Sequence, residues 1–100
     1  GRSRPILKAG DIELNPATKK VYVNNKNIPL GPKEFVILQL LMEKSGDVLS
    51  KESIENSMYG WDMEIESNTI EVHVSKLRKK IGKDSIETIK NMGYRFAICS

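Results

Sequence analysis

The segment from Ser67 to Ile81 has two faces of opposite chemistry. Four apolar residues recur at spacings of four, three and four, which places them on one side of a helix: Ile70, Val74, Leu77 and Ile81. The other side carries amide, hydroxyl and ammonium groups around one branched apolar residue: Asn68, Val72, Ser75, Lys76 and Lys79. Ammonium groups suit phosphates, side-chain donors suit base edges, and valine suits the methyl group of thymine. This outer face is therefore a candidate for contact with double-stranded DNA.

The same residues also have plainer explanations. Single exposed apolar residues such as Val72 are common. Cations near the end of a helix, such as Arg78 and Lys79, are favoured by the helix dipole and usually remain in solvent. His73 lies between the two faces, where a hydrogen-bonded structural role is as reasonable as a phosphate contact. Only the convergence of these features on one predicted surface favours binding.

The composition is that of one soluble globular domain. The chain has 100 residues, of which 39% are hydrophobic and 29% charged, enough for one modest core. Its net charge of +3 leans mildly towards an acidic partner. The one cysteine, Cys99, excludes an internal disulfide, and no apolar run reaches the length of a membrane span, so a cytoplasmic protein is expected. Residues 1–5 are polar and fit a linker or cloning remnant before a domain at 6–100.

The first third of the chain has strand character. Short segments at residues 7–9, 12–14, 20–23 and 26–28 are separated by turn-prone pairs, which predicts an antiparallel sheet of about four strands. Asn24 and Asn25 tolerate the left-handed conformation, so they predict a two-residue hairpin turn.

The hydrophobic period then changes to that of helices. Pro32 suits the first position of a helix that ends at Ser45 and Gly46. Ser50 is a candidate N-cap for a second helix ending near Gly60, and Gly82 is a candidate C-cap for the helix at residues 67–81. Residues 85–89 and 94–98 alternate around a turn and predict a β-hairpin. Three helices followed by a hairpin are the layout of an α+β winged helix-turn-helix, in which the last helix enters the major groove and the hairpin flanks it.

Three stretches carry a resemblance to a known family: "LGPKEFVILQLLMEKSGDVLSKESI", "SNTIEVHVSKLRKKIG" and "IETIKNMGYRF". In this order and at these separations the chain, from Leu7 to Phe96, resembles the effector domain of OmpR/PhoB-family two-component response regulators. The resemblance implies a four-stranded N-terminal sheet, three helices and a C-terminal wing. It also implies a receiver domain in cis, absent from this chain, whose phosphorylation promotes dimerisation on repeated promoter half-sites. The isolated domain is expected to be monomeric.

The resemblance implies roles for individual residues. Those expected to face the bases are Asn68, Glu71, Val72, Ser75 and Lys76. Those expected to contact phosphates are Tyr59, Thr69, His73, Arg78, Lys79 and Thr88. In the wing, Lys90 is expected to reach the minor groove, Gly93 to let the chain turn, and Tyr94 and Phe96 to pack the wing onto the body. The loop containing Trp61, Asp62 and Glu64 corresponds to a segment that some members use to touch RNA polymerase, although a solvated loop explains it equally well.

Several positions depart from the family pattern. The family often has tryptophan in place of Tyr59, and arginine in place of Asn68, Ser75, Lys76 and Lys90. Lysine is a point charge that cannot present a planar fork to guanine, so bidentate reading should be weaker here. The preferred DNA sequence therefore cannot be copied from relatives.

The sequence is also compatible with other functional classes. A winged helix can serve as a protein-docking module, and the cytoplasmic domain of a membrane-anchored one-component activator shares this fold. Catalysis is the weakest option, because there is one histidine, one cysteine, no glycine-rich phosphate loop and no spaced set of metal ligands. Neither a cofactor nor a metal is expected.

Overall fold

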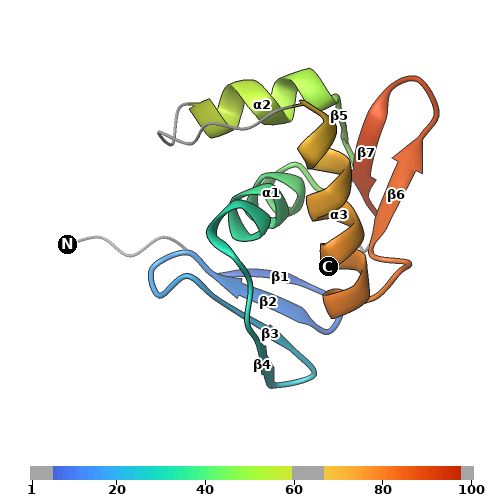
Figure 1. The fold of residues 1–100 in the computed structure, drawn as a ribbon. Helices are drawn as coiled ribbons and strands as arrows, with labels where there is room; N and C mark the ends of the chain where they lie inside the picture. Colours follow the sequence, from blue (N-terminus) through green and yellow to red (C-terminus); the bar gives the residue numbers. More distant parts are fainter. Residues whose placement is uncertain (1–5, 60–66, 98–100) are drawn as a thin grey trace.

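The structure, a computed structural model, describes the backbone of residues 6–59 and 67–97 and the side chains of residues 6–58 and 70–97. Its elements follow the predicted order (Figure 1): β1 (Leu7–Ala9), β2 (Ile12–Asn15), β3 (Lys20–Val23), β4 (Lys26–Ile28), α1 (Pro32–Glu43), β5 (Val48–Leu49), α2 (Lys51–Tyr59), α3 (Ser67–Ile81), β6 (Ile86–Ile89) and β7 (Gly93–Phe96). The fold is an α+β winged helix, as predicted.

The N-terminal strands form an antiparallel sheet in the order β1-β2-β3-β4. Asn24 and Asn25 have φ angles of 53° and 64°, so both adopt the left-handed conformation that a two-residue hairpin requires. This turn sets Val23 opposite Lys26. Ile12 and Leu14 of β2 and Val21 of β3 are buried, and the sheet lies beneath α1 and the end of α3 in Figure 1.

The three helices enclose the core above this sheet. Helix α1 begins with Pro32 at its first turn and is buried on most sides. The apolar stripe of α3 is buried as predicted, with exposed fractions of 6% or less at Ile70, Val74, Leu77 and Ile81. Lys80 of α3 forms an ion pair at 2.9 Å with Glu34, which lies in the first turn of α1. This ion pair joins the end of α3 to the start of α1.

Two predicted helix caps are confirmed, whereas α1 ends at Glu43, short of the predicted stop at Ser45 and Gly46. The backbone N–H of Ser53 donates a hydrogen bond to the Ser50 hydroxyl at 3.0 Å, so Ser50 caps α2. Gly82 follows α3 with a φ angle of +120°, a conformation that favours glycine at this position.

The C-terminal hairpin is part of a three-stranded sheet in the order β5-β7-β6, which the sequence did not predict. Strand β5 has only two residues, and Leu49 pairs with Tyr94. At Gly93, which has a φ angle of +140°, an added Cβ would lie 2.0 Å from the carbonyl oxygen of Leu49. Gly93 is therefore needed for the close approach of β7 to β5 as well as for its backbone conformation. Strand β7 also ends at Phe96 instead of continuing to the predicted residue 98.

Candidate nucleic-acid interface

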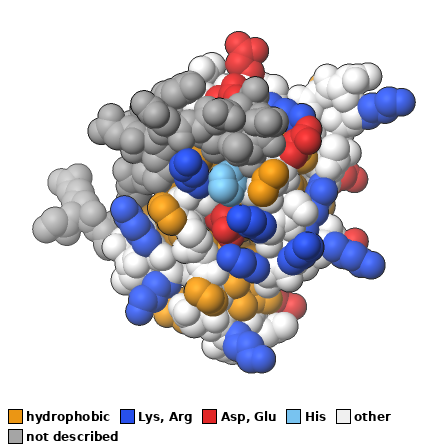
Figure 2. Space-filling view, in the orientation of Figure 1, with side chains coloured by type: hydrophobic (Ala, Val, Ile, Leu, Met, Phe, Trp, Pro, Cys, Tyr) orange, Lys and Arg blue, Asp and Glu red, His pale blue; other side chains and the backbone are white. Residues whose placement is uncertain are grey.

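Helix α3 presents its predicted outer face to solvent. Val72 is 50% exposed, and Glu71, Ser75, Lys76 and Lys79 are also exposed. Figure 1 shows α3 between α1 and the wing, with its outer side uncovered by β6 and β7. In the same orientation, Figure 2 shows Lys and Arg side chains gathered on this face around the histidine, with a hydrophobic side chain beside it. The helix thus offers one accessible face of mixed basic, polar and apolar character.

The lysines of this face are available to a ligand. Within the described residues, Lys76 and Lys79 have no hydrogen-bond or ion-pair partner. Lys80, by contrast, is held by Glu34. The face therefore retains free positive charge that phosphates can neutralise.

His73 lies at the edge of this face and is partly buried. Its Nδ1 atom is buried and has no hydrogen-bond partner among the described residues. Burial lowers the pKa of His73, and the nearby charges of Lys33 and Lys76 lower it further, while Glu34 opposes them. The imidazole is consequently neutral near pH 7 and adds no positive charge to the surface there.

Arg78 and Thr88, both expected to contact phosphates, contact each other. Nε of Arg78 donates a hydrogen bond to the backbone carbonyl of Ile86 at 3.0 Å, and a terminal nitrogen donates one to the Thr88 hydroxyl. The guanidinium also lies 6.0 Å from the centre of the Tyr94 ring. Arg78 therefore fastens the wing to α3, and a phosphate contact from either residue stays a prediction.

Lys51 is a residue of this surface that the sequence pattern did not indicate. It is the first residue of α2 and forms an ion pair with Glu71 of α3. The hydrogen bond to Glu71 raises the pKa of Lys51. One signal was available in the sequence: a lysine at the start of a helix opposes the helix dipole, so its position calls for another explanation.

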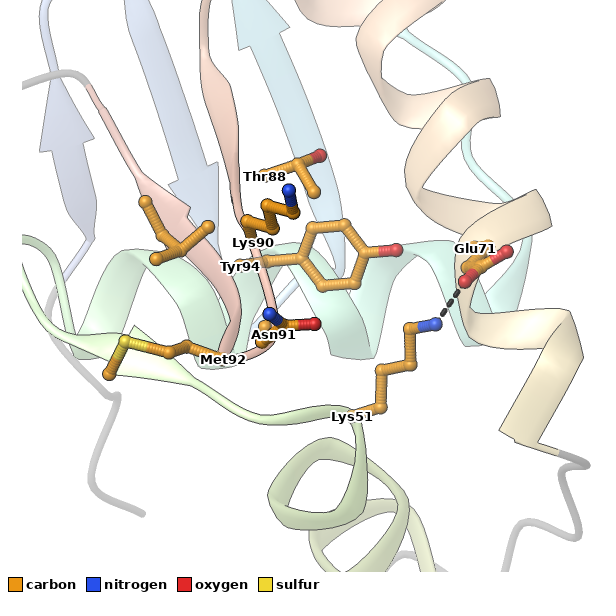
Figure 3. Close-up of a pocket in the computed structure, with 9 residues that line it drawn as sticks. Lys51, Glu71, Thr88, Lys90, Asn91, Met92 and Tyr94 are labelled. Carbon is orange, nitrogen blue, oxygen red and sulfur yellow. Dashed lines mark hydrogen bonds and ion pairs between the residues drawn. The ribbon is translucent and has the colours of Figure 1, made fainter.

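The Lys51–Glu71 pair borders a cavity of about 520 Å³ between α3, the start of α2 and the wing. Figure 3 shows the hydroxyl of Tyr94 directed towards the pair, and Met92 directed away from it. Burial is the main reason that the pKa of Tyr94 is raised, so its phenol stays protonated and can donate a hydrogen bond. Lys90 and Asn91 line the same cavity, and Met92 is 59% exposed at the tip of the wing.

Several predicted residues lie wholly or partly outside the described part of the chain. Trp61, Asp62 and Glu64 are outside it, so their expected role at a polymerase surface stays a prediction. Asn68 and Thr69 belong to α3 by their backbone, and Tyr59 is the last residue of α2. The side chains of these three residues are not among those described.

The described residues contain neither a metal-binding cluster nor a membrane-spanning helix. In this part of the chain, no three metal-ligating side chains lie close enough together to hold an ion. None of the helices within it is long and apolar enough to cross a lipid bilayer.

Known proteins share both the sequence pattern and the fold. Residues 25–96 match the family described as "Transcriptional regulatory protein, C terminal". The chain is 46% identical over 94 residues to the response regulator protein PmrA of Pseudomonas aeruginosa, covering 94% of this chain and 42% of that protein. It is 40% identical over 94 residues to the transcriptional regulatory protein QseB of Escherichia coli O157:H7, again covering 94% of this chain and 43% of the relative. The chain thus spans less than half the length of these relatives.

Solved structures agree with this relationship. The C-terminal domain of the nisin resistance regulator NsrR superposes with a TM-score of 0.79 at 33% identity, covering 90% of this chain and 94% of that one. The Klebsiella pneumoniae RstA DNA-binding domain, solved in complex with the RstA box, gives a TM-score of 0.81 at 23% identity and covers 94% and 98% of the two chains; this likeness concerns the fold.

The fold, the exposed α3 face and the wing together define a winged-helix DNA-binding domain of a transcription regulator, which is a non-enzymatic class. The chain belongs to the OmpR/PhoB family of two-component response regulators, as their C-terminal DNA-binding effector domain.

Proposed function

We propose that this domain binds double-stranded DNA sequence-specifically, with α3 in the major groove and the wing at the adjacent minor groove or backbone. The observation that carries the proposal is the outward position of Val72 and Lys76 on a helix whose opposite side is buried. The major groove is wide enough to admit an α-helix, and its edges offer hydrogen-bonding groups and the thymine methyl. Family membership supports the same function.

The exposed side chains of α3 suit two kinds of contact. Val72 matches a thymine methyl, whereas the ammonium group of Lys76 matches the acceptor atoms of guanine. The hydroxyl group of Ser75 can donate a hydrogen bond to a base edge or accept one from it. Lys79 lies one turn further along the same outer face and suits a phosphate, which positions the domain without reading sequence.

The wing supplies a second point of attachment. Lys90 is exposed next to the turn between β6 and β7 and has no ion-pair partner among the described residues. The wing is held to α3 through Arg78, so a contact by Lys90 with the minor groove would be fixed in register with the α3 contacts. In this arrangement Arg78 and Thr88 act on DNA mainly by placing the wing.

Regulation is proposed to arise in the longer protein. The relative described as a response regulator, PmrA of Pseudomonas aeruginosa, is more than twice as long as this chain. Phosphorylation of a receiver domain in cis would bring two effector domains onto adjacent half-sites, and the raised effective concentration would strengthen two individually weak contacts. The single domain is then expected to be a monomer with low affinity for one half-site.

The decisive test is a fluorescence anisotropy titration of the domain with labelled duplexes. Sites selected from a random duplex library are compared with scrambled duplexes of equal length over a series of salt concentrations. We expect preference for the selected duplexes and a linear fall of log K with log salt, because each neutralised phosphate releases counterions. A protein-docking module would show neither salt-sensitive binding nor preference, and that result would exclude the proposed function.

A further inference from the structure

The ion pair between Lys51 and Glu71 joins the start of α2 to the outer face of α3. Both side chains remain accessible, with exposed fractions of 42% and 56%. Figure 3 shows the ammonium group of Lys51 reaching across to the Glu71 carboxylate, and both residues line the cavity beside the wing. Glu71 comes directly before Val72, which lies on the face proposed to enter the major groove. The pair therefore belongs to the DNA-facing surface.

Neither stability nor helix electrostatics accounts for the pair. An exposed ion pair contributes little to folding stability. Lys51 also lies in the first turn of α2, where the helix dipole disfavours a cation. A carboxylate on this face is in turn repelled by DNA phosphates. The cation at the start of α2 and the carboxylate on the DNA-facing surface would each be unfavourable alone. Their pairing therefore indicates a role in binding DNA.

The chemistry of the carboxylate identifies what it can bind. An ionised carboxylate only accepts hydrogen bonds. Lys51 occupies Oε1 of Glu71, whereas Oε2 has no partner among the described residues. In the major groove a glutamate pairs with the N4 amino group of cytosine, which is a donor. The free oxygen of Glu71 suits that group.

Lys51 is well placed to hold the carboxylate. Its backbone follows the Ser50 cap and strand β5, which is paired to β7. The position of Lys51 is therefore set by the same sheet that holds the wing. Its ammonium group both orients Glu71 and cancels the negative charge that the phosphates would repel.

We infer that Lys51 is a positioning residue that holds Glu71 to read a cytosine through its N4 amino group. This inference rests on the proposed DNA-binding function and names one base that the domain selects. Lys51 thus acts on DNA through Glu71, in addition to any contact that Lys51 makes with a phosphate.

The test begins with duplex selection by the wild-type domain and by Glu71→Ala. The position at which the two selections differ is then changed from cytosine to pyrimidin-2-one, a cytosine analogue that lacks the 4-amino group. We expect the wild-type domain to lose about 5-fold to 100-fold in affinity for the analogue, the range of a good base contact. Glu71→Ala should bind both duplexes equally. A wild-type selection without a Glu71-dependent cytosine would overturn the inference.

Variants of Lys51 then separate positioning from simple charge. Lys51→Met should reduce the discrimination between cytosine and the analogue, and Lys51→Arg should restore much of it. Lys8→Met is the matched control, because Lys8 also forms an exposed ion pair, with Glu13 at 3.6 Å, but on the N-terminal sheet. It should leave discrimination unchanged.

The outcomes distinguish this inference from the proposed function. If Lys51→Met weakens binding to the cytosine, analogue and scrambled duplexes by one common factor, Lys51 serves only as a cation and the positioning role is wrong. DNA binding itself would stand in that case. Absence of salt-sensitive duplex binding by the wild-type domain would instead reject the proposed function. Circular dichroism of each variant confirms that the fold is retained.

Discussion

Arg78 of α3 is hydrogen-bonded to Thr88 of β6, and its Nε also donates to the carbonyl oxygen of Ile86 in the same strand. A planar guanidinium with several fixed donors can hold a strand backbone and a hydroxyl at once, which an ammonium group does less well. The contact joins the helix proposed to read bases with the wing proposed to flank them. Arg78 therefore sets the geometry of the interface from inside the protein.

Arg78→Ala is expected to destabilise the domain by about 1–3 kcal/mol, because the partly buried hydrogen bond to the Ile86 carbonyl and the exposed one to the Thr88 hydroxyl are both lost. Urea unfolding followed by circular dichroism measures this change. Lys79→Ala is the matched control, since Lys79 is the next residue of α3 and is exposed; it should change stability by less than about 0.5 kcal/mol. On DNA, Arg78→Ala should weaken cognate and scrambled duplexes alike.

Lys76→Ala is expected to lose about 1–3 kcal/mol of binding free energy on the cognate duplex and to relax its base preference. The reason is that Lys76 is exposed on the outer face of α3 and is free to reach a base edge. Parallel titrations with cognate and scrambled duplexes measure the effect. Equal losses on the two duplexes would show that Lys76 contacts only phosphate.

Val72→Ala is expected to remove the preference for thymine at one position. A methyl group buried between protein and base contributes about 0.8 kcal/mol, so replacing that thymine by deoxyuridine should cost the wild-type domain about this much. The Val72→Ala domain should bind the thymine and deoxyuridine duplexes equally. A penalty for deoxyuridine that persists in Val72→Ala would assign the methyl contact to another residue.

Gly93→Ala is expected to destabilise the domain by about 2 kcal/mol or more, because the new Cβ would overlap the Leu49 carbonyl and separate β5 from β7. Gly82→Ala is the matched control. Gly82 also has a positive φ angle, +120°, but a Cβ added there would meet no atom within 4 Å. The difference between the two variants in urea unfolding isolates the overlap from the backbone strain. Equal destabilisation would show that strain alone requires Gly93.

His73 is expected to make stability depend on pH. Burial holds its folded-state pKa below the ordinary value, so the unfolded chain takes up a proton more readily. Stability from this group is therefore fully present above the unfolded-state pKa of about 6.5 and is lost as the pH falls towards the lower folded-state pKa. Urea unfolding at several pH values should show a smaller loss in acid for His73→Asn than for the wild-type domain. Parallel pH profiles would contradict the role of His73.

Much of the fold followed from local signals. The pair Asn24-Asn25, the proline at the start of α1 and the Ser50 cap each specify backbone geometry through nearby atoms, so the sequence placed them correctly. The apolar spacing of α3 likewise separated its buried stripe from the exposed Val72.

The features that were missed depend on contacts between distant segments. Strand β5 has two residues, too few for any hydrophobic period, and exists because β7 pairs with it. By sequence, Arg78 is an ordinary cation near a helix end; its hydrogen bond to the Ile86 carbonyl exists only because the fold places β6 beside α3. Lys51 and Glu71 are twenty positions apart in sequence and lie on different helices. Neither periodicity nor composition can indicate such pairings.

The pairing of β5 with β7 has a consequence for the design of hybrid regulators. Because Leu49 is bonded into the wing sheet and is followed at once by Ser50 and Lys51, the wing and the entry into α2 form one mechanical unit. Transplanting the hairpin alone between paralogues would place a foreign β7 against the native strand β5, Val48–Leu49. A functional module for exchange should therefore contain Val48 to Lys51 together with residues 86–96.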